Sequence, residues 1–344
     1  MVYLHVYRSR FGRRSLIMLP DMIIIGENIH CSRVVKAGGP RCAKRADGSL
    51  RITWEESGTG TSAAFAVPTT LAGAKVKHVI AALQVARAGQ AESAAAQDYL
   101  VWLARQQELA GAHYLDVNVD EYSLNQETNA DAMRWLATFL AGHTRLPLAL
   151  DSSAVGVLQA GSEAAPAAGP PWLLNSASME RLEVLDLAVA TGAAVLCSGA
   201  GATVLPQTAA ERVAALAPVV AAARERGLPS ARLFLDPLVL PIGMDPLQGM
   251  AFLDACRELR QCHGPTVQVV GGISNVSYGM PERRLLNQRF LHLAIVAGLD
   301  AAIYDPLQLT PGTWTPELVA AADRVLTGDD AFAADFFALV RRQT

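Results

Sequence analysis

Acidic and amide side chains recur in this sequence at the ends of short apolar runs that have the length of buried strands. These residues are Asp116, Asn118, Asp151, Asn175, Asp236 and the pair Ser274-Asn275. Carboxylates accept hydrogen bonds from N–H groups, whereas amides both donate and accept them. A set of this kind, with few lysines beside it, suits a neutral, amide-like heterocycle and fits a phosphate poorly.

The same residues could instead serve the turns and helices that follow each run, because Asp and Asn are common in turns and as helix caps. That alternative is reasonable for any one of them. It weakens for the whole set, since Ser or Thr would cap equally well and since Asp236 and Asp305 precede proline. We therefore interpret the polar run ends as parts of one site.

The apolar runs that carry these residues occur about eight times. They are Met22–Gly26, Tyr114–Asn118, Pro147–Asp151, Trp172–Asn175, Ala194–Ser198, Leu233–Asp236, Thr266–Gly271 and Ala301–Tyr304. Helical patterns lie between most of them, as in Gln97–Ala110, Thr128–Leu140, Glu180–Ala190, Ala209–Arg226, Pro246–Gln261 and Arg283–Ala297. Eight alternating units predict a (β/α)8 TIM barrel, in which the carboxyl ends of the strands converge on one face.

One segment interrupts this alternation, from Cys31 to about Gly89. It is basic and rich in turn residues, and its Asp47-Gly48 dipeptide lies between two short runs, which is a hairpin signal. We predict a single domain over residues 22–344, with an insertion or lid after the first strand at about 31–89 and a terminal helix at 331–342.

Residues 1–21 are expected to be a doubtful leader or a mis-assigned start. Four arginines precede a short apolar run there. A twin-arginine export signal would need a longer apolar segment and a small-residue cleavage site. A start at Met18 or Met22 fits the sequence better.

Composition excludes several classes of protein. The 344 residues are 51% hydrophobic and 18% charged with a formal net charge of −3, which argues against intrinsic disorder and against nucleic-acid binding. The longest uncharged stretch, between Asp186 and Glu211, is broken by glycines and a proline, so no membrane span is predicted. Five cysteines without a CxxC pair indicate a reduced, cytoplasmic protein without a zinc site.

Six motifs follow one another in barrel order. They are Ile25-Gly26-Glu27-Asn28-Ile29, Leu115-Asp116-Val117-Asn118-Val119, Leu150-Asp151-Ser152, Leu174-Asn175-Ser176-Ala177-Ser178-Met179-Glu180, Leu235-Asp236-Pro237-Leu238 and Gly271-Gly272-Ile273-Ser274-Asn275-Val276-Ser277. The series resembles the pterin-binding barrel superfamily, and within it the corrinoid-dependent methyltetrahydrofolate methyltransferases and the folate module of cobalamin-dependent methionine synthase. The similarity runs from about residue 22 to 306, the insertion excepted.

The resemblance implies a role for each matching residue. Asp151, Asn175 and Asp236 fall where the family holds the pyrimidine ring of the pterin. Asn275 falls on the asparagine that reaches N5, the nitrogen that bears the methyl group, and is the predicted catalytic residue. Arg283 falls on an arginine of the family's binding surface, although a plain helix-surface charge is the alternative and Arg284 is its neighbour. The predicted substrate-binding set also includes Asp116, Asn118 and Ser274.

The implied reaction is methyl transfer between N5 of methyltetrahydrofolate or tetrahydrofolate and the cobalt of a corrinoid, in a direction that the sequence leaves open. A methyl group on a tertiary amine is a poor electrophile unless the nitrogen is protonated or strongly hydrogen-bonded as the bond breaks. Asn275 offers a hydrogen bond, and no general acid is identified beside it. The cobalt(I) nucleophile belongs to the cofactor.

The absence of certain motifs narrows the expected role. The sequence has no Asp-x-His-x-x-Gly corrinoid motif and no zinc-binding Cys/His spacing. We therefore expect the corrinoid (cobalamin) to be supplied by a separate corrinoid-binding protein. A homodimer is expected from the resemblance.

Two alternatives stay open. Dihydropteroate synthase shares the barrel and the pterin-holding set, but it needs a basic residue at the seventh strand and Arg-x-His near the eighth, where this chain has Gly271–Asn275 and Tyr304-Asp305-Pro306. A non-catalytic folate-binding subunit would keep the same Asp/Asn cluster.

Glu27 and Asn28, directly after the first predicted strand, either line the mouth of the barrel or serve as caps.

Overall fold

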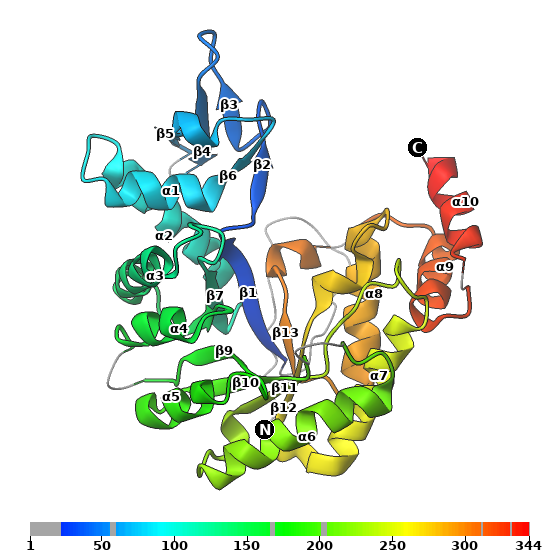
Figure 1. Cartoon of the computed structure of the whole chain (residues 1–344). Coiled ribbons are helices and arrows are strands. Elements are labelled where there is room, and N and C mark those ends of the chain that lie inside the picture. The colour runs from blue at the N-terminus through cyan, green and yellow to red at the C-terminus, as the bar shows by residue number, and fades with distance from the viewer. Residues whose placement is uncertain are drawn as a thin grey trace.

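The computed structural model describes residues 22–55, 60–165, 169–200, 205–310, 312–330 and 332–343, so the predicted leader lies outside the described residues. Eight parallel strands form a closed barrel in the order β1-β13-β12-β11-β10-β9-β8-β7, and β7 pairs with β1 to close it (Figure 1). Their bounds are β1 Ile23–His30, β7 Tyr114–Asn118, β8 Leu148–Asp151, β9 Leu173–Ala177, β10 Ala194–Ser198, β11 Leu233–Asp236, β12 Gln268–Gly272 and β13 Ala301–Ile303. The predicted TIM barrel is confirmed.

Alternation along the strands builds two apolar layers. One set of side chains fills the barrel interior: Ile25, Ala149, Leu173, Ala194, Leu196, Phe234, Val270 and Ala301. The residues between them, such as Leu115, Leu150 and Leu174, belong to the larger core that the strands share with the helices. Because successive side chains point to opposite faces of a strand, this parity also decides which polar residues face the interior.

Helices surround the barrel. Their bounds are α1 His78–Arg87, α2 Ser93–Leu109, α3 Gln126–Ala141, α4 Val155–Ser162, α5 Glu183–Thr191, α6 Ala209–Glu225, α7 Gln248–His263, α8 Arg283–Val296, α9 Pro316–Thr327 and α10 Ala334–Gln343. Short 3-10 turns are η1 Thr69–Leu71, η2 Ser230–Arg232, η3 Gly264–Thr266, η4 Ile273–Ser277 and η5 Pro306–Leu309. Local sequence sets several starts: the Asn125 side chain caps α3, and Thr208 and Glu211 form a capping box on α6.

The segment between β1 and α1 forms two small antiparallel sheets. One pairs β2 (Val34–Lys36) with β6 (Lys75–Lys77), and the other joins β3 (Cys42–Lys44), β4 (Leu50–Glu55) and β5 (Ser62–Ala66). The hairpin predicted at Asp47-Gly48 is present between β3 and β4, where Gly48 has a φ of 84°. Figure 1 shows both sheets beyond the end of β1, beside α1 and α2.

The three-stranded sheet shares its core with a barrel helix. Trp54 and Phe65 lie against Tyr99 of α2, with ring centroids 5.1 and 5.6 Å apart respectively. Aromatic pairs at this separation stabilise beyond the area they bury. This contact fixes the small sheet to the barrel wall.

No helix in the described part of the chain is long and apolar enough to cross a membrane.

Candidate active site

Three of the predicted site residues lie side by side at the carboxyl ends of neighbouring strands. Asn118 of β7 is in register with Asp151 of β8, which is in register with Asn175 of β9. The Asn118 Nδ2 donates a hydrogen bond to Asp151 Oδ2 at 3.0 Å, and Asn118 Oδ1 accepts one from the backbone N–H of Asp120. The three side chains have the parity that faces the barrel interior, so they line one mouth.

Asp116 lies one interior-facing step deeper on β7 and is buried. Its Oδ1 has no hydrogen-bond partner in the described structure. Burial raises the pKa of Asp116 well above its usual range, and the carboxylates of Asp151 and Glu27 raise it further. Burial therefore favours the protonated form of Asp116, whose Oδ1 is available to a ligand in the mouth.

Asp151 is also harder to ionise than an ordinary aspartate. Burial raises the pKa of Asp151 to about 6, although the hydrogen bond from Asn118 and the nearby Arg181 guanidinium oppose the shift. At neutral pH this carboxyl group is ionised, and it then accepts hydrogen bonds from N–H groups.

Asp236 ends β11, across the mouth. Burial raises the pKa of Asp236 to about 6, opposed by the backbone N–H of Leu238, which donates to Oδ1 at 2.8 Å, and by Arg212. Leu238 has a φ of 68°, an uncommon conformation for a non-glycine residue. The alternative that these polar residues stabilise local turns is therefore partly correct for Asp236, because its Oδ1 accepts a hydrogen bond within this turn.

Arg212, which sequence reasoning missed, supports that turn from α6. It is fully buried, donates to the Leu238 carbonyl at 2.7 Å and also donates to Gln248 Oε1. A charged residue in the first turns of an otherwise Ala-rich helix is the signal that could have identified it. Its guanidinium holds the Asp236–Leu238 turn in place and places a positive charge behind Asp236.

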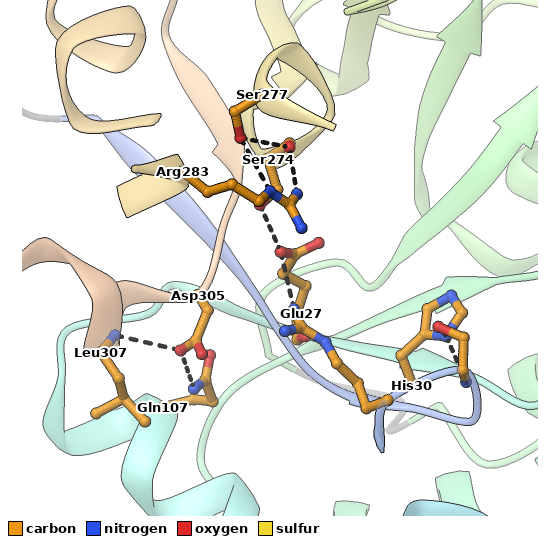
Figure 2. A network of polar contacts seen from close by, with 10 residues as sticks. Glu27, His30, Gln107, Ser274, Ser277, Arg283, Asp305 and Leu307 are labelled. Carbon is orange, nitrogen blue, oxygen red and sulfur yellow. Dashed lines mark hydrogen bonds and ion pairs between the residues drawn. The ribbon is translucent and has the colours of Figure 1, made fainter. Parts of the chain in front are cut away.

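The turn after β12 carries Ser274 and Asn275 in η4. Ser274 Oγ donates to Glu27 Oε1 at 2.9 Å, and the Asn275 side chain is exposed at the mouth. A Cβ on Gly272 would lie 3.1 Å from Asn275 Nδ2, so glycine at this position leaves room for the amide. Figure 2 shows Ser274 pointing toward Glu27, so that strand β1 and the turn after β12 meet here.

Arg283 holds this same turn. Its Nε donates to Ser277 Oγ at 3.1 Å and its Nη2 to the Ser274 carbonyl at 2.9 Å (Figure 2). Arg284 instead donates to Thr310 and lies over the Trp314 ring, 5.8 Å from its centroid. Of the two neighbouring arginines, Arg283 is therefore the one that contacts the turn bearing Asn275.

Glu27 and Asn28 lie within β1, and this corrects the expectation that the strand ends at Gly26. A bulge between Gly26 and Ile29 extends the strand to His30. Glu27 faces Ser274 and forms an ion pair with Arg33 at 2.8 Å, so it does not act as a helix cap. Burial raises the pKa of Glu27, opposed by Arg33 and by Ser274.

Asn28 and Asp305 have local structural partners. Asn28 Nδ2 donates to the Leu103 carbonyl of α2 at 2.9 Å. Asp305 caps η5 through the Leu307 N–H, and it accepts a hydrogen bond from Gln107 at 2.9 Å (Figure 2). The expectation that a proline after Asp305 disfavours a capping role was wrong, because the proline occupies the first turn of η5, where no N–H is needed.

A second group missed by sequence reasoning ties three mouth loops together. Asp120, after β7, accepts hydrogen bonds from the Ser152 and Ser153 hydroxyls at 2.5 and 2.8 Å. Arg181, after β9, donates to Ser176 Oγ at 2.9 Å and to the Ser152 carbonyl at 3.1 Å. The Ser-Ser pair directly after Asp151 was the available signal. These contacts hold the loops that carry Asn118, Asp151 and Asn175.

Within the described ranges, no group of three or more His, Cys, Asp or Glu side chains could hold a metal ion. The five cysteines are unpaired, and Cys262 is the exposed one.

The fold is a TIM barrel whose strands carry acidic and amide side chains at one mouth. The chain belongs to the pterin binding enzyme family, whose sequence model matches residues 87–305. The match begins after the two small sheets and includes β7 through β13.

Curated relatives narrow the comparison. A methylcorrinoid:tetrahydrofolate methyltransferase of Eubacterium limosum is 29% identical over 205 residues, which are 57% of this chain and 72% of that protein. Methionine synthase of Mycobacterium leprae (strain TN) is 31% identical over 243 residues, which are 66% of this chain and 20% of that protein. This chain thus spans about a fifth of the methionine synthase. The predicted family and the predicted class of enzyme, a methyltransferase, agree with these matches.

Solved structures support the fold. The dihydropteroate synthase of Yersinia pestis, bound to a pterin-sulfa conjugate, aligns with a TM-score of 0.50 over 68% of this chain and 89% of that one. Sequence identity is 17%, so the likeness concerns the barrel architecture alone.

Proposed function

We propose that this enzyme transfers a methyl group between N5 of tetrahydrofolate and the cobalt of a corrinoid that a separate protein carries. One observation carries the proposal: interior-facing acidic and amide side chains from β7, β8, β9 and β11 meet at one mouth of a pterin-family barrel. The reaction named for the Eubacterium limosum relative supports the same chemistry.

The pyrimidine half of a pterin fits the chemistry of the three predicted ring-binding residues. This half carries N–H donors beside a carbonyl acceptor. Ionised Asp151 and Asp236 would accept from the N–H groups, and Asn175 would both donate and accept. The raised pKa values of Asp151 and Asp236, about 6 each, leave both carboxyl groups ionised at neutral pH.

The methyl transfer itself needs a proton or a strong hydrogen bond at N5. When the N5–CH3 bond breaks, its electron pair remains on N5 and must be stabilised, and the methyl group goes to cobalt(I), the nucleophile that the corrinoid supplies. Asn275 would hydrogen-bond N5 from the exposed turn after β12. Asp116, whose burial favours the protonated form and whose Oδ1 has no partner in the described structure, is the candidate source of that proton.

The loops that surround the mouth, here called the rim, have features that favour the binding of a protein partner. Exposed apolar side chains lie on the loops after six barrel strands: Leu124, Met179, Leu205, Met244, Tyr278 and Leu307. These loops all follow the carboxyl ends of barrel strands, so the six side chains lie on the same face of the barrel, and apolar residues exposed on one face favour an interaction with another protein. We propose that the corrinoid-binding protein docks on this rim and brings its cobalt over the pterin.

Several related expectations belong to the same proposal. We propose a cytoplasmic homodimer in which residues 22–344 act as one domain, with the two small sheets as an insertion. Sedimentation velocity on the purified chain would test the dimer.

The direct test uses absorbance spectra of the corrinoid. The protein is incubated with cob(I)alamin and methyltetrahydrofolate, and separately with methylcobalamin and tetrahydrofolate, each with and without a cognate corrinoid protein. Conversion in either mixture supports the proposal, and the faster mixture gives the direction. If no mixture reacts, the proposal is wrong.

Two alternatives have their own tests. Dihydropteroate synthase activity would need basic groups at β12, where Gly271 and Gly272 end the strand and the nearby Arg283 is engaged by Ser274 and Ser277. Condensation of pterin diphosphate with p-aminobenzoate by the purified chain would favour it. For a non-catalytic folate-binding subunit, Asn275→Ala should leave methyl transfer unchanged while folate still binds.

A further inference from the structure

The two-stranded sheet of β2 (Val34–Lys36) and β6 (Lys75–Lys77), here called the β2–β6 ribbon, carries three lysines that have no role in the proposed methyl transfer. Residues 31–77 contain eight lysines and arginines against three acidic residues, whereas the whole chain has 29 against 32. The segment is therefore strongly basic within a slightly acidic protein. Three of these basic residues form ion pairs with Glu27, Glu92 and Glu121, which lie outside the segment. The remaining five still exceed the three acidic residues, and this excess of positive charge favours an anionic ligand.

Two lysines of the ribbon lie directly opposite each other. Lys36 of β2 is in register with Lys75 of β6, and the inward-facing pair is Val35 with Val76, both buried. Both lysines are exposed, and the side chain of neither forms an ion pair or hydrogen bond with another described residue. Like charges directly opposite on a sheet face are destabilising. A bound anion between them would remove that cost.

The ribbon is tied to the rim of the proposed pterin site. Lys77 Nζ forms an ion pair with Glu121, in the loop after β7, at 2.6 Å. Arg33, which directly precedes β2, pairs with Glu27, and Glu27 in turn contacts Ser274 beside Asn275. Lys36 is three residues beyond Arg33, or about 10 Å along the strand. Figure 1 shows β2 and β6 extending from the end of β1.

The proposed pterin orientation directs the substrate's tail to this sector. With the pyrimidine ring at β8, β9 and β11, and N5 at the turn after β12, the ring carbon next to N5 faces β12, β13 and β1. Strand order places β13 and β1 next after β12. The tail attached to that carbon therefore leaves the mouth toward Glu27, Arg33 and the ribbon.

We propose that the outward face of the β2–β6 ribbon, centred on Lys36 and Lys75, binds the γ-linked glutamates of a polyglutamylated folate. Each additional glutamate adds one carboxylate, which suits a row of unpaired ammonium groups. The inference rests on the proposed function, because it needs the pterin to occupy the mouth as described. It makes polyglutamylated tetrahydrofolate the preferred substrate.

The test compares the affinities for tetrahydrofolate monoglutamate and pentaglutamate by anaerobic titration calorimetry. The wild-type chain should bind the pentaglutamate roughly three- to tenfold more tightly at low salt, a range that matches two exposed ion pairs. Added salt should reduce this preference. The double variant Lys36→Gln, Lys75→Gln should lose the preference and bind the monoglutamate as the wild type does.

Lys44→Gln is the matched control, because Lys44 is an exposed lysine on β3 of the other small sheet. It should keep the preference, and thermal melts of all variants should agree. If the wild type binds both folates equally, or if the double variant keeps the preference, the proposal is wrong. It is also wrong if the double variant raises only the KM for a corrinoid protein, since the ribbon would then be a protein-docking surface. Failure of the monoglutamate itself to bind would overturn the proposed function as well.

Discussion

The Asn118 amide donates a hydrogen bond to the Asp151 carboxylate across the β7–β8 pair, with Nδ2 and Oδ2 3.0 Å apart. This bond opposes the effect of burial, which raises the pKa of Asp151 to about 6. It therefore favours the ionised form of Asp151, which is the form that would accept hydrogen bonds from the proposed pterin. Under the proposed function, Asn118 would act on the pterin through the charge state of Asp151.

Asn118→Ala should raise the pKa of Asp151 further, because the hydrogen bond that stabilises the carboxylate is lost. Tetrahydrofolate affinity near pH 7 should then fall by roughly tenfold, as one charge-assisted hydrogen bond is worth about 1.5–3 kcal/mol. Affinity measured from pH 5.5 to 8.5 should recover at high pH in the variant. A loss of affinity that is the same at every pH would contradict this role for Asn118.

Binding by the wild type should depend on pH through the same carboxyl groups. Burial raises the pKa of Asp151 and of Asp236 to about 6. The proposed contacts with the pterin need both carboxyl groups ionised. Tetrahydrofolate affinity should therefore be constant above about pH 7 and fall as the pH drops through 6. Titrations in buffers of constant ionic strength would check this, and an affinity that is unchanged down to pH 5 would contradict it.

Stability should change with pH in the opposite sense. The folded-state pKa of Asp151 lies above the ordinary value, so the folded protein holds more protons than the unfolded chain between about pH 4 and 6. The contribution of Asp151 to the free energy of unfolding therefore decreases as the pH rises through this window, by at most about 3 kcal/mol. Urea unfolding of the wild type and of Asp151→Asn should show it: the variant should gain stability relative to the wild type as the pH rises. A constant difference between them would contradict the expectation.

Much of the barrel was predictable from the sequence. Three predicted strands, Tyr114–Asn118, Ala194–Ser198 and Leu233–Asp236, have the same bounds in the structure. Parallel strands buried on both faces consist of short apolar runs, and polar residues end them where the mouth begins. This pattern involves only residues that are adjacent in the chain, so it can be recognised in a single sequence.

The contacts that shape the site were less predictable, because they join residues far apart in the chain. Ser274 meets Glu27 across 247 positions, and Arg181 reaches Ser152 from the next loop. Extension of β1 past Gly26 was missed because the bulge interrupts the alternation that identifies a strand. Register and side-chain direction between elements decide such contacts, and neither is encoded in a local run.

Arg283 and Arg284 offer a matched pair of substitutions. Arg283 donates to the Ser274 carbonyl and to Ser277 Oγ, whereas Arg284 contacts Thr310 and Trp314. Arg283→Ala should loosen the turn that presents Asn275 and lower the kcat of methyl transfer by about tenfold or more, because small displacements of a positioning group are costly. Arg284→Ala should keep kcat close to that of the wild type. Equal losses from both variants would mean that neither arginine has a specific effect on the turn.

Asp116→Asn tests the proton at the base of the mouth. The substitution keeps the size of the side chain but removes the acidic proton, the form of Asp116 that burial favours. Single-turnover methyl transfer with methyltetrahydrofolate and cob(I)alamin should slow by about 10²-fold or more, within the usual range for a general acid. Tetrahydrofolate affinity should change far less, because Asp151, Asn175 and Asp236 remain. The rate of the wild type should also fall at high pH as Asp116 ionises, and the variant should not show that fall. A variant that transfers the methyl group at the wild-type rate would exclude Asp116 as the proton source and leave Asn275 as the only group proposed at N5.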